Sequence, residues 1–384
     1  MATDKHKYPS VHCGLVRAAV RLLEEENHPA AKRFQAGEIE LLVSEAAAPD
    51  RMGDRQQGTG RHYYCAVTPD GVPVEPADFP GVFPNGTGRP APSPLTMAEA
   101  EYRTALALER AGKFAPAMLS LARAAHMIED ICCPPHSTGL TYFSRYGKQH
   151  RRYEAQAAAL FWGGEYSDAD FVTAAEQWAA PAKGLVPYDL YTDLVPDLTE
   201  AKGFQHRGGF VTICNQLAVS SAADLPSVLG GDEAVREASI RKQLAASVAN
   251  TAALFAAFHR DAADPDLPVW LERTPYRLYS FGAQKNLFDD PIYLDFDEDG
   301  AVTLHTLEGD TLSVGRFGKV TLSDPQPGLT TAFRFGCEPL LTLFPAGDQS
   351  RPVACSGTRL YTANRRFMRG LRHTVQTSFA LIPD

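Results

Sequence analysis

Histidines and carboxylates recur at short, regular intervals between residues 126 and 154. His126 and Asp130 lie four residues apart, His150 and Glu154 repeat that spacing, and His136 lies between the two pairs. The string therefore reads H-x3-D-x5-H-x13-H-x3-E. Imidazole and carboxylate groups are ligands of Zn²⁺, and residues four apart on a helix project from the same face. We therefore predict a zinc site built by two helices.

The alternative is that these side chains form ordinary surface ion pairs and packed core histidines. That alternative is sufficient for any single pair. The chain has only 11 histidines and 46 acidic residues among 384, however. A preset pattern of five such residues should then arise by chance in roughly one chain in ten thousand, so the metal interpretation is favoured.

The elements that must position these groups are helices. Helical periodicity extends over Val11–Glu26, His28 to about Ala48, Met97–Ala111, Phe114–Ile131, Gly147–Trp162 and Asp232–Arg260. Asp232 is the expected N-cap of the last of these helices.

The pattern changes between residues 262 and 272, and short β-branched and aromatic runs follow. These runs are Tyr276–Phe281, Ile292–Phe296, Ala301–Thr306, Lys319–Leu322, Ala332–Phe335, Leu340–Phe344 and Val375–Ile382. We therefore predict two domains: an all-α catalytic domain over residues 1–262 and an all-β accessory domain over residues 270–384. A sandwich and a trefoil both remain open for the second domain.

Composition excludes some classes of protein. The net charge of −9 argues against a protein that coats nucleic acid, which needs Lys and Arg to neutralise phosphates. No apolar run reaches the length of a membrane span, and no signal peptide is present in the chain as given. As it stands the chain is expected in the cytoplasm, although the compartment is left open.

The seven cysteines are expected to be thiols of the core. Their number is odd and they are spread along a long chain, which argues against a disulfide scaffold. There is no C-x2-C pair, so a thiolate zinc site is not expected. Cys13, Cys132 and Cys133 adjoin predicted ligands without being ligands themselves.

The metal-ligand string resembles a signature of the zinc-dependent phospholipase C family, which is related to the P1/S1 nucleases. That signature, H-x3-D-[IL]-x2-P-x-H, matches His126 to His136. His150 and Glu154 then follow at the spacing of the phospholipase branch, whereas the nuclease branch has a longer gap and ends in Asp. The resemblance covers most of residues 10–160 and extends to about residue 262.

Three upstream elements also resemble the family. His12 corresponds to an early histidine at a helix start, Asp50 follows Pro49 as in a small-x-P-D element, and His62 begins an H-[FY]-[WY] element. Asp54 is the alternative aspartate, but the proline before Asp50 favours Asp50.

The resemblance implies two or three zinc ions per chain. The implied ligands are His12, Asp50, His62, His126, Asp130, His136, His150 and Glu154. One position would use His62, His126 and Asp130, with Asp50 close by or bound.

A second implied position would use His136, His150 and Glu154, and a third His12 and Asp130, which bridges to the first. The family completes the third position with an N-terminal tryptophan exposed by signal cleavage, whereas this chain begins Met-Ala. The amino group of Ala2 or the side chain of His6 is a substitute ligand there.

The activity implied by the resemblance is hydrolysis of a phosphodiester, of phospholipase C type. Metal-bound hydroxide would attack phosphorus, Asp50 would orient or deprotonate it, and Glu154 would act mainly as a ligand at the catalytic site. The substrate would be a small-molecule or lipid phosphoester, and nucleic acid is not favoured. The family is mostly secreted, which conflicts with the missing signal peptide.

Three other functions remain open. The chain is alternatively a P1/S1-like nuclease, a metal-dependent hydrolase or lyase redirected to a non-lipid small molecule, or a non-catalytic scaffold for a ligand-binding β-domain. Clostridial members of the family attach a calcium-binding, membrane-docking β-sandwich after the helices. The β-domain here is accordingly a candidate for peripheral membrane or glycan contact.

Asp295–Gly300 has the D-x-D-x-D-G opening of a calcium loop. The twelfth position is Thr306 instead of Glu, which excludes an EF-hand. A β-hairpin turn explains the same residues and is the favoured interpretation.

Overall fold

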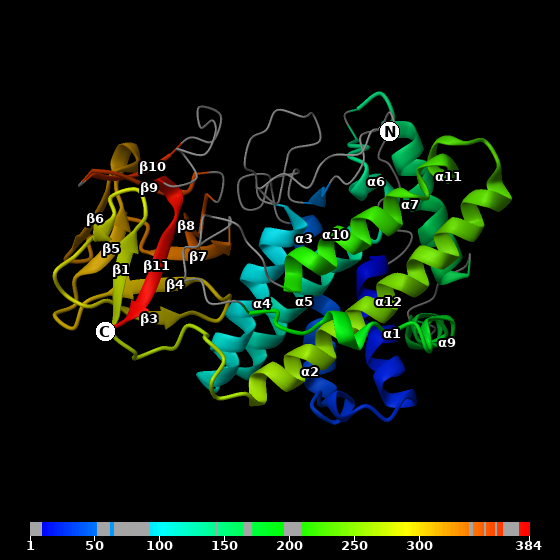
Figure 1. Cartoon of the computed structure of the whole chain (residues 1–384), viewed down its shortest axis with the longest axis horizontal. Coiled ribbons are helices and arrows are strands. Elements are labelled where there is room, and N and C mark those ends of the chain that lie inside the picture. Colours follow the sequence, from blue (N-terminus) through cyan, green and yellow to red (C-terminus); the bar gives the residue numbers. More distant parts are fainter. Residues whose placement is uncertain are drawn as a thin grey trace.

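The computed structural model describes residues 10–51, 62–64, 93–142, 144–163, 171–195, 209–337, 341–348, 351–357, 359–363 and 376–384. Helices form the first part of the chain and an antiparallel sheet the last part, so the predicted fold class is confirmed. Figure 1 shows the strands at one end of the molecule and the helices at the other. The exact domain limits, 1–262 and 270–384, stay a prediction.

The helical part contains α-helices and short 3-10 turns. They are α1 (Val11–Glu25), η1 (Pro29–Lys32), α2 (Ala36–Glu45), α3 (Ala48–Arg51), α4 (Pro94–Arg110), α5 (Phe114–Ile131), α6 (Pro134–Ser137), α7 (Gly147–Trp162), α8 (Phe171–Glu176), α9 (Ala179–Ala182), η4 (Tyr188–Leu190), α10 (Gly209–Ala222), α11 (Leu225–Leu229) and α12 (Glu233–Ala263). The helices α1, α4, α5, α7 and α12 agree with the predicted ranges to within three residues at each end. Asp232 caps α12 by accepting hydrogen bonds from the backbone N–H groups of Ala234 and Val235, as predicted.

Helix α5 is the central element for the candidate site. It is rich in Ala, Leu and Met, which favour helix, and it is buried along most of its length. It ends at Ile131 because Pro134 and Pro135, which begin α6, cannot continue its hydrogen-bond pattern. This turn reverses the chain and returns His136 toward the last turn of α5.

The start of α7 is fixed by a glycine. A Cβ on Gly147 would collide with the backbone carbonyl of Tyr142, so only glycine lets the helix begin against this loop. Helix α7 consequently starts close enough to place His150 and Glu154 beside α6.

The C-terminal part is all antiparallel. Its elements are β1 (Tyr276–Ser280), β2 (Lys285–Asn286), β3 (Tyr293–Phe296), β4 (Val302–His305), β5 (Thr311–Val314), η5 (Arg316–Gly318), β6 (Val320–Ser323), β7 (Ala332–Cys337), β8 (Leu341–Pro345), β9 (Val353–Ser356), β10 (Arg359–Thr362) and β11 (Phe379–Pro383). The seven predicted strands are present, while β2, β5, β9 and β10 were not predicted.

The sheet follows the order β2-β1-β11-β8-β7-β4-β5-β6, with β3 added on β4 and β9-β10 as a separate pair. The last strand closes on the first, with Tyr276 opposite Pro383 and Ser280 opposite Phe379. The pairing among the described strands shows no threefold repeat of a four-strand unit. The order therefore favours a sandwich over a trefoil.

The Asp297–Gly300 turn docks the sheet onto the helices. Asp297 Oδ1 accepts hydrogen bonds from the backbone N–H groups of Asp299 and Ala301, so the favoured hairpin interpretation is confirmed. Arg123 of α5 donates from Nη1 to the Asp299 carbonyl at 2.8 Å. Gly300 has φ +77°, and a Cβ there would lie 2.9 Å from Ser120 Oγ.

The described cysteines, Cys13, Cys132, Cys133, Cys214, Cys337 and Cys355, are free thiols. Within the described part of the chain, no helix combines the length and apolar character needed to cross a membrane. The buried apolar side chains of the described ranges form a connected cluster that extends from the helices into the sheet.

Replacing Gly300 with alanine should destabilise the protein by about 2–3 kcal/mol, because the change adds backbone strain to a close contact with α5. Gly309→Ala is the matched control, since Gly309 also has positive φ but no atom lies within 4 Å of the position that its Cβ would take. The control should cost only about 1 kcal/mol. Denaturant unfolding of both variants measures the difference, and equal costs would contradict the docking role.

Candidate metal centre

The eight predicted ligands converge on one region. They come from α1 (His12), α3 (Asp50), the segment 62–64 (His62), α5 (His126, Asp130), α6 (His136) and α7 (His150, Glu154). Residues more than a hundred positions apart in sequence are thereby placed within contact distance. His6, the suggested extra ligand, and Ala2 lie outside the described residues, as does Asp54.

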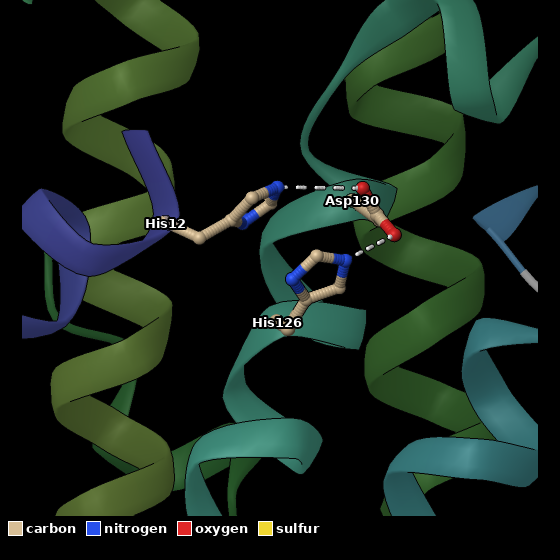
Figure 2. Close-up of side chains that lie close together, drawn as sticks. All are labelled: His12, His126 and Asp130. Carbon is tan, nitrogen blue, oxygen red and sulfur yellow. Dashed lines mark ion pairs between the residues drawn. The ribbon is translucent and has the colours of Figure 1, made fainter. Parts of the chain in front are cut away.

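The carboxylate of Asp130 lies at the middle of this region. Its Oδ2 is 2.7 Å from His62 Nδ1 and 3.2 Å from His126 Nε2. Its Oδ1 is 3.1 Å from His136 Nδ1 and 3.8 Å from His12 Nε2. Figure 2 shows His12 reaching from α1 toward Asp130, with His126 one turn earlier on α5. Four imidazoles therefore surround one buried carboxylate.

Glu154 forms a second gathering point. Its Oε1 is 2.7 Å from His150 Nε2 and 3.2 Å from His136 Nε2. Tyr142 donates its hydroxyl hydrogen to the other oxygen, Oε2, and its ring stacks on His150 with centroids 4.2 Å apart. His136 is shared between this carboxylate and Asp130.

The rings of four histidines are oriented by hydrogen bonds at Nδ1. Nδ1 donates to the Ala46 carbonyl in His126 (2.7 Å), to the His62 carbonyl in His136 (2.8 Å), and to the Leu140 carbonyl in His150. In His12 the partner of Nδ1 is the carboxylate of Glu129, 2.7 Å away.

A carbonyl oxygen can only accept a hydrogen bond, so Nδ1 in these rings carries the hydrogen. Nε2 is then the atom left to bind a metal, and in all four rings it faces Asp130 or Glu154. This is the arrangement of metal-binding histidines whose second nitrogen is fixed by an outer partner. His62 differs, because it turns Nδ1 toward Asp130 and lies 3.3 Å from His126 Nε2.

Among the residues that the structure describes, three sets of side chains are compact enough to hold an ion. They are His12 with His126 and Asp130, Asp50 with His62 and His126, and Cys133 with His136 and Glu154, and in each set one ligand atom per residue lies within 4.8 Å of the others. The first two sets differ from the predicted grouping, because His126 belongs to both. The third contains Cys133, which was not predicted as a ligand.

Asp50 lies at the solvent-facing side of the centre. Its side chain is 52% exposed, and its carboxylate oxygens are 4.0 Å from His12 Nε2 and 3.8 Å from His126 Nε2. By contrast, Asp130 is 3% exposed. Asp50 is therefore the most exposed of the three carboxylates, since the Glu154 side chain is 33% exposed.

Sequence reasoning missed Glu129 and Tyr142. Glu129 is buried on α5, where its Oε1 accepts a hydrogen bond from Thr251 of α12 and its Oε2 contacts His12. Its only signal in the sequence is an acid beside Asp130 on an otherwise apolar helix. Tyr142 lies in a loop with no motif that would mark it.

The buried charges shift several pKa values. Burial lowers the pKa of His12, but the hydrogen bond and charge of Glu129, with Asp50 and Asp130, raise it to about 9. For Asp130, burial raises the pKa, yet His136, His126 and His62 together hold it well below its ordinary value. The metal-free centre thus keeps Asp130 ionised and His12 protonated near neutral pH.

Comparison with known proteins gives structural matches, among them two distant alpha toxins. No protein-family model matches the chain, and neither does any curated protein. Among solved structures the chain is similar to an alpha toxin from Clostridium absonum, with TM-score 0.48 and 12% identity over 99% of this chain and 98% of that chain. It is also similar to an alpha-toxin from an avian strain of Clostridium perfringens, with TM-score 0.41 and 14% identity over 94% and 98%. At such values neither likeness assigns a residue role or an activity to this chain.

Replacing Glu129 with glutamine should weaken zinc binding by about 10- to 100-fold, because the charge that orients and polarises His12 is lost. Glu109→Gln is the matched control, since Glu109 is also a largely buried acid but pairs with Arg33 outside the centre. Competition against a chromogenic chelator measures both affinities. Equal affinities in the two variants would show that Glu129 does not support a ligand.

In the metal-free protein, the free energy of unfolding should fall as the pH rises from about 6.5 to about 9. The folded state keeps a proton on His12 in this interval that the unfolded state has lost, so the stabilisation is complete below the lower value and disappears above the upper one. The expected loss is about 3 kcal/mol, because each pKa unit corresponds to about 1.4 kcal/mol. Denaturant unfolding at several pH values should show a flatter profile for His12→Asn, and an unchanged slope would contradict this assignment.

Proposed function

We propose that this protein is a zinc-dependent hydrolase of phosphoesters, of phospholipase C type, with two or three zinc ions per chain. The observation that carries the proposal is the orientation of His12, His126, His136 and His150. Each ring has an outer partner at Nδ1 and turns Nε2 toward a carboxylate. The Nε2-to-carboxylate distance is 2.7 Å for His150, 3.2 Å for His126 and His136, and 3.8 Å for His12. An unprotonated ring nitrogen and a carboxylate oxygen repel each other at such distances unless a proton or a cation accompanies them.

The donor set fits zinc in particular. Imidazole nitrogens with one or two carboxylates are the usual ligands of catalytic zinc, whereas Ca²⁺ and Mg²⁺ prefer oxygen alone. His12, His62, His126 and Asp130 would hold metal on one side of the centre, and His136, His150 and Glu154 on the other. Bound zinc would supply a Lewis acid for phosphate oxygens and would lower the pKa of water.

The side chains of the chain have distinct roles in such a reaction. Asp50, exposed beside His12 and His126, is placed to accept a proton from the attacking water. Glu154 contacts His136, His150 and Tyr142. Its role would be to bind metal and to orient the two histidines beside it. The buried carboxylate of Asp130 would hold the surrounding imidazole rings in their positions.

The choice of a phosphodiester rests on the H-x3-D-x5-H-x13-H-x3-E string and its resemblance to the phospholipase branch. The net charge of −9 disfavours nucleic acid as the main substrate. A membrane or glycan contact through the β-domain and the compartment both stay predictions. A nuclease activity is an outcome of the test below.

Asp50→Asn should lower kcat on a chromogenic phosphodiester by about 10²- to 10⁴-fold while leaving the zinc content unchanged, because the proton acceptor is lost and the inner ligands remain. Asp232→Asn is the matched control: asparagine caps a helix as well as aspartate does, and Asp232 lies at the start of α12. The control should keep both activity and zinc.

Zinc per chain by elemental analysis is measured on the same samples, which are then assayed on phosphatidylcholine vesicles and single-stranded DNA. Hydrolysis of phosphatidylcholine supports the phospholipase assignment, and preferential cleavage of DNA would replace it with the nuclease alternative. A chain without zinc would overturn the proposal. Zinc without any phosphodiester turnover would indicate redirected chemistry, and full activity of Asp50→Asn would remove the role given to Asp50.

A further inference from the structure

A thiol lies at the Glu154 side of the centre. One ligand atom from each of Cys133, His136 and Glu154 lies within 4.8 Å of the other two. His136 Nε2 is 3.2 Å from Glu154 Oε1, and His150 Nε2 contacts the same oxygen at 2.7 Å. A sulfur, the imidazole nitrogen of His136 and a carboxylate oxygen therefore meet in a small volume, and the imidazole of His150 contacts the same carboxylate oxygen.

The backbone explains why Cys133 and His136 lie side by side. Cys133 is the N-cap of α6, and its carbonyl accepts hydrogen bonds from the N–H groups of His136 (2.9 Å) and Ser137 (3.2 Å). Pro134 and Pro135 restrict φ within this turn, so the turn is rigid. The result is a C-x2-H pair held by one hydrogen-bonded turn.

The neighbouring thiol is placed differently. Cys132 closes α5, is 2% exposed, and belongs to none of the three compact sets of ligand atoms among the described residues. Its side chain lies beside Ser247 of α12 instead. The two adjacent cysteines thus differ in what they face, although their chemistry is identical.

We propose that Cys133 is a thiolate ligand of a metal position that it forms with His136 and Glu154. The inference rests on the proposed zinc binding and deepens it. As the sulfur–metal bond forms, the thiol releases its proton to solvent, so no electron transfer and no further reactant are needed. A C-x2-C pair is needed only where two thiolates bind the metal, whereas one thiolate beside imidazoles needs only C-x2-H.

With this ligand, the two sides of the centre would have different roles. Cys133, His136 and Glu154 would provide at least three protein ligands on this side, and His150 contacts the Glu154 carboxylate. The other side is bounded by the exposed Asp50 and keeps access to water. Substrate hydrolysis would then take place beside His12 and His126, and the Cys133 side would hold α6 and α7 together.

Cobalt substitution tests this assignment without an activity assay. Co²⁺ bound to nitrogen and oxygen ligands shows d–d bands in the visible, while a thiolate ligand adds a sulfur-to-cobalt charge-transfer band in the near ultraviolet. The wild-type chain loaded with Co²⁺ should show both. Cys133→Ser should lose the charge-transfer band and bind one metal ion fewer per chain, whereas Cys132→Ser, the matched control, should keep both.

The possible outcomes distinguish the Cys133 ligand from the zinc binding on which it rests. A charge-transfer band that persists in Cys133→Ser, or d–d bands without charge transfer in the wild type, would overturn the Cys133 ligand and leave the proposed zinc binding intact. The absence of any cobalt band in the wild type would overturn the proposed function itself. If Cys133→Ser does not fold, the double variant Cys13→Ser, Cys132→Ser should still show the charge-transfer band, and its loss there would contradict the proposal.

Discussion

The buried carboxylate of Asp130 is the group on which the rest of the centre depends. Four imidazoles from α1, the segment 62–64, α5 and α6 lie within 4 Å of its oxygens. A buried charge of this kind is costly unless positive charge compensates it. In the metal-free protein, protonated histidines supply this positive charge. Bound cations would supply it without requiring the rings to be protonated. The helices are thus arranged around side chains that could hold cations.

The supporting structure reaches beyond the ligands. Arg123, one turn before His126 on α5, donates to Glu45 at 2.7 Å and to the Asp299 carbonyl of the β-domain at 2.8 Å. Glu45 is followed by Ala46, whose carbonyl orients His126. Two adjacent residues therefore link these features. Glu45 pairs with the arginine that contacts the β-domain, and Ala46 orients His126. This gives the β-domain a structural link to the centre, in addition to any partner that it binds.

Much of this could be predicted because it follows from local spacing. The four-residue separations of His126 from Asp130 and of His150 from Glu154 placed each pair on one helix face, and the structure brings both pairs into contact. The helices α5 and α7 also begin and end where the periodicity indicated. The far-apart ligands His12, Asp50 and His62 came only from the family resemblance, because nothing local to them predicts a shared site.

What could not be predicted depends on tertiary contacts. The partners of Nδ1 in His126 and His150 are main-chain carbonyls, which leave no mark in a sequence. Glu129 acts through a helix that meets α12 only after folding. Strand β5 was missed because a four-residue run with polar Thr311 and Ser313 resembles a loop until its partner strands bury it.

In the proposed centre, Nε2 of four inward-facing histidines binds metal while Nδ1 keeps its outer partner. Long-range proton–nitrogen NMR of the imidazole rings during a zinc titration measures this directly, since it distinguishes the two ring nitrogens. We expect zinc to shift the Nε2 resonances of His12, His126, His136 and His150 while Nδ1 of these rings stays protonated. In His62 the Nδ1 resonance should shift instead. Coordination through Nδ1 of the four rings, or spectra unchanged by zinc, would contradict it.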